Sequence, residues 1–131
     1  MNRLAVYCGS ATPADPRYVA LAREVGGTLA ARGIGVVYGG GKLGLMGALA
    51  DGALAAGGEV VGVIPEAMVQ AEVANLACTE LRVVKTMHER KAAFTDLSDG
   101  FLTFPGGVGT MDELWEAVSW SQLGYHDKPV R

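Results

Sequence analysis

The chain has 131 residues, of which 50% are hydrophobic and 19% are charged, and its net charge is -3. This length suffices for one domain with a packed core, and the lack of a basic block argues against DNA or RNA as a partner. Two cysteines are too few for a disulfide scaffold, no apolar run approaches the ~20 residues of a membrane span, and the first residues lack a signal-peptide pattern, so we expect a cytoplasmic protein.

Short apolar runs rich in β-branched residues alternate along the chain with segments of helical periodicity. The predicted strands are residues 4–8, 34–38, 59–64, 81–84 and 101–104, and the predicted helices are residues 16–32, 45–56, 86–97 and 110–123. Residues 67–79 are left without regular structure. Near-continuous apolar strands that alternate with helices indicate a parallel sheet covered on both faces. We therefore predict one α/β domain over residues 1–131, a Rossmann-like doubly wound parallel sheet with right-handed crossovers.

The last residues, 127–131, look like the entry to a sixth strand. An open parallel sheet is not expected to stop there. We therefore expect a chain truncated on its C-terminal side, with the last strand and helices missing after residue 131.

Ligands of doubly wound sheets bind beyond the carboxyl ends of the strands, and two polar residues lie at such ends here. Ser10 follows the first strand; no G-x-S-x-G surrounds it, so we expect it to hydrogen bond a ligand rather than act as a nucleophile. Glu66 follows the third strand, where a carboxylate can meet ribose hydroxyls or a catalytic water. A loop carboxylate in solvent is an equally good interpretation.

Residues 39–44 read Gly-Gly-Gly-Lys-Leu-Gly, which fits G-x-G-x-x-G between a predicted strand and a predicted helix. Such glycines let the backbone approach a phosphate at the amino end of the helix. The segment is not a P-loop, because Leu43 stands where a P-loop has Ser or Thr. The alternative is a strand-to-helix turn whose glycines permit close packing.

Residues 105–114 read Pro-Gly-Gly-Val-Gly-Thr-Met-Asp-Glu-Leu. The three glycines leave backbone amides unobstructed, Thr110 adds a hydroxyl, and the following helix adds its positive end, so a phosphate would fit. The alternative is a capping box in which Glu113 bonds the amide of Thr110 and does no chemistry. Three glycines exceed what capping needs, which favours a ligand.

Residues 87–91 read Met-His-Glu-Arg-Lys and place His88, Arg90 and Lys91 in the first turns of a helix, where cations oppose the helix dipole. This arrangement favours an anionic partner from ligand or protein, above all for Arg90. The alternative is a solvated basic face paired with Glu89 or Glu80. Without a second well-placed histidine or a cysteine pair, no metal site is predicted.

Arg90 and Lys91, followed by Pro-Gly-Gly-Val-Gly-Thr-Met-Asp-Glu, resemble the paired signature of the Lonely Guy family, the cytokinin riboside 5′-monophosphate phosphoribohydrolases, many of which carry the older label "lysine decarboxylase-like". The family pattern P-G-G-x-G-T-x-x-E ends on Glu113. Further similarity in VYCGS, VYGGGKLGLMG, VVGVIPE and WSQLGYHDKPV extends the resemblance over nearly the whole chain. Family chains continue past this point with another strand and helices.

The resemblance implies hydrolysis of N6-modified adenosine 5′-monophosphates, or of AMP, to the free base and ribose 5-phosphate, by a homodimer or higher assembly and without a cofactor. It implies that Arg90 and Glu113 are catalytic. An ionised Glu113 would stabilise the positive charge that develops on the ribose, while Arg90, which stays protonated, would orient the nucleotide. The remaining expected substrate contacts are Ser10, Gly40, Gly41, Glu66, Met87, Lys91, Gly106, Gly107, Val108, Gly109 and Thr110.

Two other classes of function stay open at this point. One is a non-catalytic nucleotide-binding module, a sensor or carrier on the same fold. The other is a dinucleotide-dependent oxidoreductase, suggested by G-x-G-x-x-G; the second glycine loop and the pairing of Arg90 with Glu113 argue against it. Lysine decarboxylation is not supported, because no lysine lies in a recognisable pyridoxal phosphate site.

Overall fold

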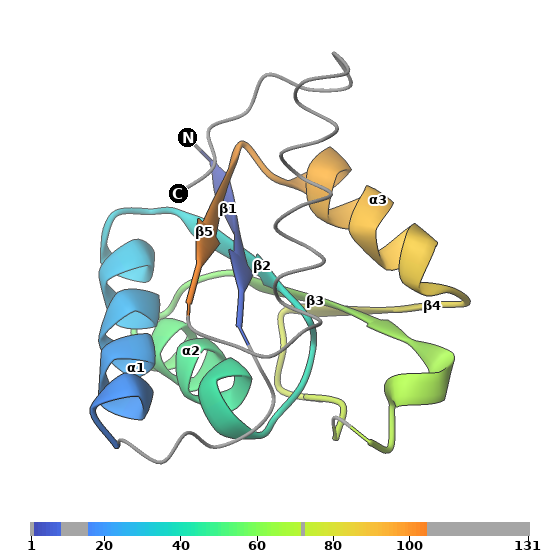
Figure 1. Cartoon of the computed structure of the whole chain (residues 1–131). Helices are drawn as coiled ribbons and strands as arrows, with labels where there is room; N and C mark the ends of the chain where they lie inside the picture. Colours follow the sequence, from blue (N-terminus) through green and yellow to red (C-terminus); the bar gives the residue numbers. More distant parts are fainter. Residues whose placement is uncertain (1, 9–15, 72, 105–131) are drawn as a thin grey trace.

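A computed structural model describes residues 2–8, 16–71 and 73–104 of the chain (Figure 1). Within these residues, five parallel strands form one sheet in the order β4-β3-β2-β1-β5. In chain order the elements are β1 (Arg3–Tyr7), α1 (Pro16–Ala31), β2 (Gly35–Tyr38), α2 (Gly44–Ala55), β3 (Val60–Pro65), the 3₁₀ helix η1 (Glu66–Met68), β4 (Glu80–Val84), α3 (Met87–Leu97) and β5 (Gly100–Thr103).

The predicted strands and helices in this part of the chain are confirmed, and each end lies within one residue of its prediction. The short helix η1 was not predicted. The predicted helix 110–123 lies outside the described residues, as does the expected truncation after residue 131. None of the described helices combines the length and the apolar composition that crossing a membrane requires.

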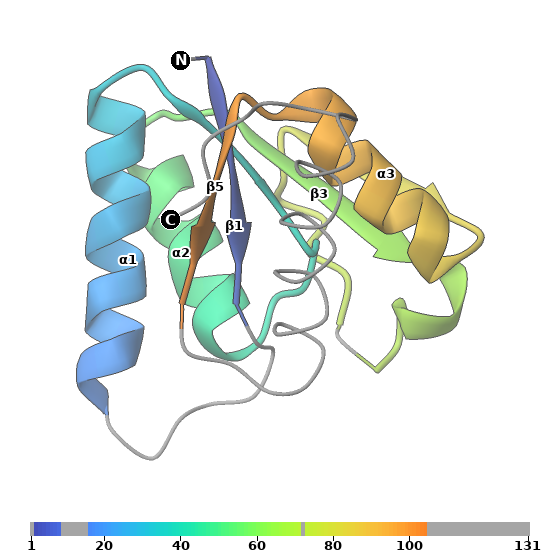
Figure 2. The ribbon, with the colours of Figure 1, turned by 45° about the horizontal axis from the view of Figure 1, so that its top comes forward.

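The sheet separates two apolar layers, because successive side chains of a strand point to opposite faces. Val6 packs with Tyr38 and the α1–α2 layer, whereas Ala5 and Tyr7 pack with Phe94 of α3. Figures 1 and 2 accordingly show α1 and α2 on one face of the sheet and α3 on the other. Helices on both faces of a parallel sheet define the doubly wound α/β fold that the sequence predicted.

The strand order reverses next to β1. The chain moves outward from β1 through β2 and β3 to β4, and then returns to the other side of β1 to form β5. Strands β1 and β5 stay paired to their ends, where the amide of Phe104 donates to the carbonyl of Tyr7 at 2.8 Å. This reversal is the switch point at which doubly wound sheets bind ligands.

Helices α1 and α2 cross with their backbones in contact. A Cβ added to Gly26 would lie 2.9 Å from the amide nitrogen of Ala53, and one added to Gly52 would lie 2.8 Å from the carbonyl carbon of Arg23. Real Cβ atoms do not approach other atoms this closely, so the crossing requires glycine at both positions.

We expect Gly52→Ala to lower the free energy of unfolding by about 1–3 kcal/mol, because the new methyl group forces the two helices apart. Gly27→Ala is the matched control, since a Cβ there would meet its nearest neighbour, the Gly52 carbonyl oxygen, at an ordinary 3.7 Å. The control should leave stability unchanged or raise it by up to about 1 kcal/mol through helix propensity. Urea unfolding followed by circular dichroism measures both, and equal losses would contradict the close crossing.

Candidate functional site

Arg90 is a buried arginine whose guanidinium lies across the ends of two strands. The residue is 2% exposed although it belongs to the first turn of α3. Its Nε donates to the carbonyl of Val63 in β3 at 2.9 Å, and its Nη2 donates to the carbonyl of Gly39, directly after β2. The alternative of a solvated basic face is therefore wrong for Arg90.

The N-terminal cap of α3 fixes where the helix that carries Arg90 begins. The Oγ1 of Thr86 accepts from the amide of Glu89 at 3.1 Å, and the Glu89 carboxylate accepts from the amide of Lys85 at 3.1 Å. The first bond satisfies an amide that a helix leaves open at its start, and the second ties the residue before the cap to the first turn. Glu89 thus caps α3, and Glu80, the other carboxylate considered for the basic face, pairs with Arg82.

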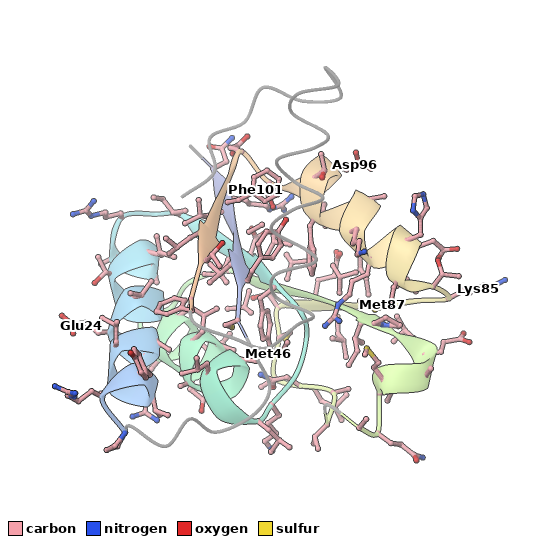
Figure 3. The ribbon with its side chains drawn as sticks, viewed as in Figure 1. Glu24, Met46, Lys85, Met87, Asp96 and Phe101 are labelled. Atoms are coloured by element: carbon pink, nitrogen blue, oxygen red, sulfur yellow. The ribbon has the colours of Figure 1, made fainter. Side chains whose placement is uncertain are left out.

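In the described part of the chain, backbone carbonyls, two thioethers and an aromatic ring contact the guanidinium. Burying a charge is unfavourable unless hydrogen bonds replace its hydration, and the two carbonyl dipoles serve that purpose. The Nη1 atom lies 3.7 Å from the sulfur of Met68 and 3.9 Å from that of Met87, and the Phe94 ring centroid lies 5.8 Å from the guanidinium carbon. Figure 3 shows Met87 at the start of α3, beside the end of β3.

Gly39 leaves no room for a side chain beside the guanidinium. A Cβ at this position would lie 2.6 Å from the terminal methyl group of Met46, and closer still to Nη2 of Arg90. Met46 belongs to α2, on the opposite face of the sheet from α3 (Figure 3). The glycine therefore lets side chains from both helical layers meet at the end of β2.

The following glycines pack within the protein. Gly40 adopts a φ of 79°, which favours glycine, and its carbonyl accepts from the amide of Asn75 at 2.8 Å. The carbonyl of Gly41 accepts from the hydroxyl of Tyr38 at 2.8 Å. All three residues from 39 to 41 are buried. The close-packing interpretation of this loop is confirmed, and contact of Gly40 and Gly41 with a nucleotide stays a prediction.

Two residues that the sequence patterns did not indicate, Tyr38 and Asn75, bond to each other beneath this loop. The side-chain amide of Asn75 donates to the Tyr38 hydroxyl at 3.1 Å, and the sulfur of Cys78 lies 3.5 Å from the same oxygen. Burial, and then the bond to Cys78, raises the pKa of the Tyr38 hydroxyl, which therefore remains protonated and able to donate. A tyrosine that ends an apolar strand before a glycine run was the available signal.

The other predicted site residues divide into two groups. Met87, Lys91 and Glu66 lie with Arg90 at the carboxyl end of the sheet: Lys91 is half-buried in α3, and Glu66 is exposed at the first position of η1. The second group lies outside the described residues and comprises Ser10, Gly106, Gly107, Val108, Gly109, Thr110 and Glu113. Within the described ranges, no group of three or more His, Cys, Asp or Glu side chains could hold a metal ion.

A cavity of about 420 Å³ lies at the opposite, amino end of the strands, lined by Asn2, Arg3, Glu59, Leu97 and Asp99. Arg3 and Glu59 form an ion pair at 2.8 Å there, and the hydrogen bond from Arg3 lowers the pKa of the Glu59 carboxyl. None of the predicted site residues lines this cavity, so it is separate from the candidate site.

The chain is similar over nearly its whole length to proteins named as phosphoribohydrolases. A family model described as possible lysine decarboxylase matches residues 46–131. The probable cytokinin riboside 5′-monophosphate phosphoribohydrolase LOGL1 of Oryza sativa subsp. japonica is 47% identical over 98% of this chain and 58% of the relative. The cytokinin riboside 5′-monophosphate phosphoribohydrolase of Rhodococcoides fascians is 47% identical over 95% of this chain and 63% of the relative. The chain thus spans less than two thirds of the length of these relatives.

Solved structures share the fold. The crystal structure of TM1055 superposes with a TM-score of 0.81 at 25% identity, and the match covers 99% of this chain and 72% of that chain. The molybdenum cofactor carrier protein from Chlamydomonas reinhardtii superposes with a TM-score of 0.80 at 24% identity, covering 98% of this chain and 74% of that one. These likenesses confirm the predicted α/β fold, and the second shows the fold alone.

We expect Gly39→Ala to lower the free energy of unfolding by about 1–3 kcal/mol, because its methyl group overlaps the guanidinium of Arg90. In an Arg90→Ala background the same change should cost at least about 1 kcal/mol less, since only the flexible thioether of Met46 then has to move. Urea unfolding of the four proteins completes this double-mutant cycle. An identical cost in both backgrounds would contradict the contact.

Proposed function

The chain belongs to the possible lysine decarboxylase family, as the Lonely Guy resemblance predicted, and we propose that it is a phosphoribohydrolase that cleaves the N-glycosidic bond of N6-modified adenosine 5′-monophosphates, or of AMP. The products are the free base and ribose 5-phosphate. The observation that carries the proposal is the buried guanidinium of Arg90, fixed by two backbone carbonyls at the ligand-binding end of the sheet. Relatives that are 47% identical carry the name of this activity.

In this proposal Arg90 orients the nucleotide. A guanidinium stays protonated in proteins and is a poor general acid, but its planar fork donates several hydrogen bonds in fixed directions. The bonds of Nε to Val63 and Nη2 to Gly39 hold that fork before substrate arrives. Among the described residues, Nη1 contacts the thioethers of Met68 and Met87, which are weak acceptors. A phosphate or purine acceptor would form a stronger bond with the guanidinium than these sulfur atoms do.

Glu113 and the loop 106–110 complete the proposed site. The loop would hold the 5′-phosphate on its backbone amides, and an ionised Glu113 would stabilise the positive charge that develops on the ribose as the base leaves. The sheet supports this placement: β5, which precedes the loop, pairs with β1, which precedes Ser10. The two strands therefore end side by side, at the switch point of the sheet.

Further parts of the proposal come from the sequence alone. We propose a cytoplasmic homodimer or higher homo-oligomer, in which a neighbouring subunit helps to complete the site. The further contacts to the nucleotide would come from Ser10, Gly40, Gly41, Glu66, Met87 and Lys91. The net charge of -3 argues against a nucleic acid as the partner, whereas a small phosphorylated ligand needs only local cations. A nucleotide carrier or sensor on the same fold is the competing function, and it would bind AMP without releasing base.

The first functional test is chromatographic. The protein is incubated with N6-isopentenyl-AMP and, separately, with AMP, and free base is quantified. We expect base release from the wild type and none from Glu113→Gln. The variant should still bind nucleotide, because the proposed phosphate loop 106–110 is unchanged. Binding of nucleotide by a folded wild type that releases no base would favour a carrier or sensor. Turnover by Glu113→Gln at the wild-type rate would remove Glu113 from catalysis.

A second test addresses Arg90. We expect Arg90→Lys to lower kcat/KM by about 100-fold or more, because one ammonium group cannot donate to both carbonyls and also direct a planar fork at the nucleotide. The matched control is Arg32→Lys, at an exposed position just after α1. The control should keep wild-type kcat/KM. Comparable activity of the two variants, each folded by circular dichroism, would contradict the orienting role.

A further inference from the structure

The segment 73–75 forms backbone hydrogen bonds with residues 40 and 42 of the glycine-rich loop that follows β2. The amide of Asn75 donates to the carbonyl of Gly40 at 2.8 Å, and the amide of Lys42 donates to the carbonyl of Val73 at 2.8 Å. Gly41 and Ala74 lie opposite each other between these two bonds, as an isolated antiparallel bridge. The loop that follows β2 is therefore held from outside by a segment distant in sequence.

The side chain of Asn75 adds a second attachment to the same loop. Asn75 is 2% exposed, and its Nδ2 donates to the Tyr38 hydroxyl, which donates in turn to the carbonyl of Gly41. Its Oδ1 accepts from the amide of Ala77 at 3.1 Å, which fixes the orientation of the side-chain amide. The backbone amide of Asn75 thus holds the carbonyl of Gly40, and its side chain, through the Tyr38 hydroxyl, holds the carbonyl of Gly41.

These two carbonyls come immediately after the one that binds Arg90. The carbonyl of Gly39 accepts from Nη2, and the space beside it is too small for a Cβ, so a small movement of the loop changes this contact. The bond from Nε to Val63 belongs to β3 and does not depend on the loop. Loss of the loop attachment would therefore loosen the contact of Nη2 while the bond of Nε to Val63 remains.

We propose that Asn75, together with the Tyr38 hydroxyl, is a positioning residue for Arg90: it holds the Gly39–Gly41 loop so that the Gly39 carbonyl fixes the plane of the guanidinium. The proposal rests on the proposed function for its effect on turnover. Its effect on Arg90 itself is independent of that function, because the contacts exist without a bound nucleotide.

The test compares Tyr38→Phe and Asn75→Ala with Tyr18→Phe. Tyr38→Phe keeps the buried ring and removes only the hydroxyl, so it remains informative if Asn75→Ala does not fold. Tyr18→Phe is the matched control, on the exposed side of α1. Two quantities are measured: kcat and KM for N6-isopentenyl-AMP, and the ¹⁵N–¹H resonances of the Arg90 guanidinium in the unliganded protein, assigned by their loss in Arg90→Lys.

We expect Tyr38→Phe and Asn75→Ala to shift or broaden the Arg90 resonances and to lower kcat about tenfold or more, with a smaller change in KM, whereas Tyr18→Phe changes neither. Folded variants with wild-type resonances would overturn the proposal, even if kcat falls, because the residues would then act other than through Arg90. If the wild type releases no base, the proposed function fails, and the resonances alone decide: a shift supports the positioning role and an unchanged spectrum refutes it.

Discussion

A buried guanidinium must find hydrogen-bond acceptors inside the protein, and the site is arranged around this requirement of Arg90. Among the described residues, its acceptors include the carbonyls of Val63 and Gly39. The first belongs to β3, whereas the second belongs to a loop that has to be held in place. The absence of a side chain at Gly39, the φ of 79° at Gly40 and the hydrogen bonds from Asn75 and Tyr38 all serve that placement.

The fold brings these parts together through its parallel strand order. Carboxyl ends of parallel strands lie at one edge of the sheet, so the loop after β2, the helix η1 after β3 and the start of α3 after β4 meet there. Arg90 reaches this edge from α3, and Met46 reaches it from α2 on the other face. The same edge includes the switch point between β1 and β5, beyond which the proposed phosphate loop begins.

Local sequence patterns predicted the strands and the long helices of the described residues, but they did not predict the contacts of Arg90 and Asn75. Strand and helix ends could be predicted within one residue, and glycines mark several of them, as Gly33 does with a φ of 71° after α1. The helix holding Arg90 was also predictable, but its burial was not, because a long side chain can leave its own helix for carbonyls elsewhere. Asn75 lies in a segment without periodicity, and its role depends on a bridge to Gly41 that no local rule indicates.

The most direct measurement is a crystal structure of Glu113→Gln with N6-isopentenyl-AMP bound, since this variant should hold substrate without turning it over. The account predicts a phosphate oxygen or a purine nitrogen within about 3 Å of a terminal nitrogen of Arg90. It also predicts that Nε remains on the carbonyl of Val63. A nucleotide bound away from the carboxyl ends of β2 and β3, with no contact to Arg90, would contradict the central claim that this buried guanidinium orients the substrate.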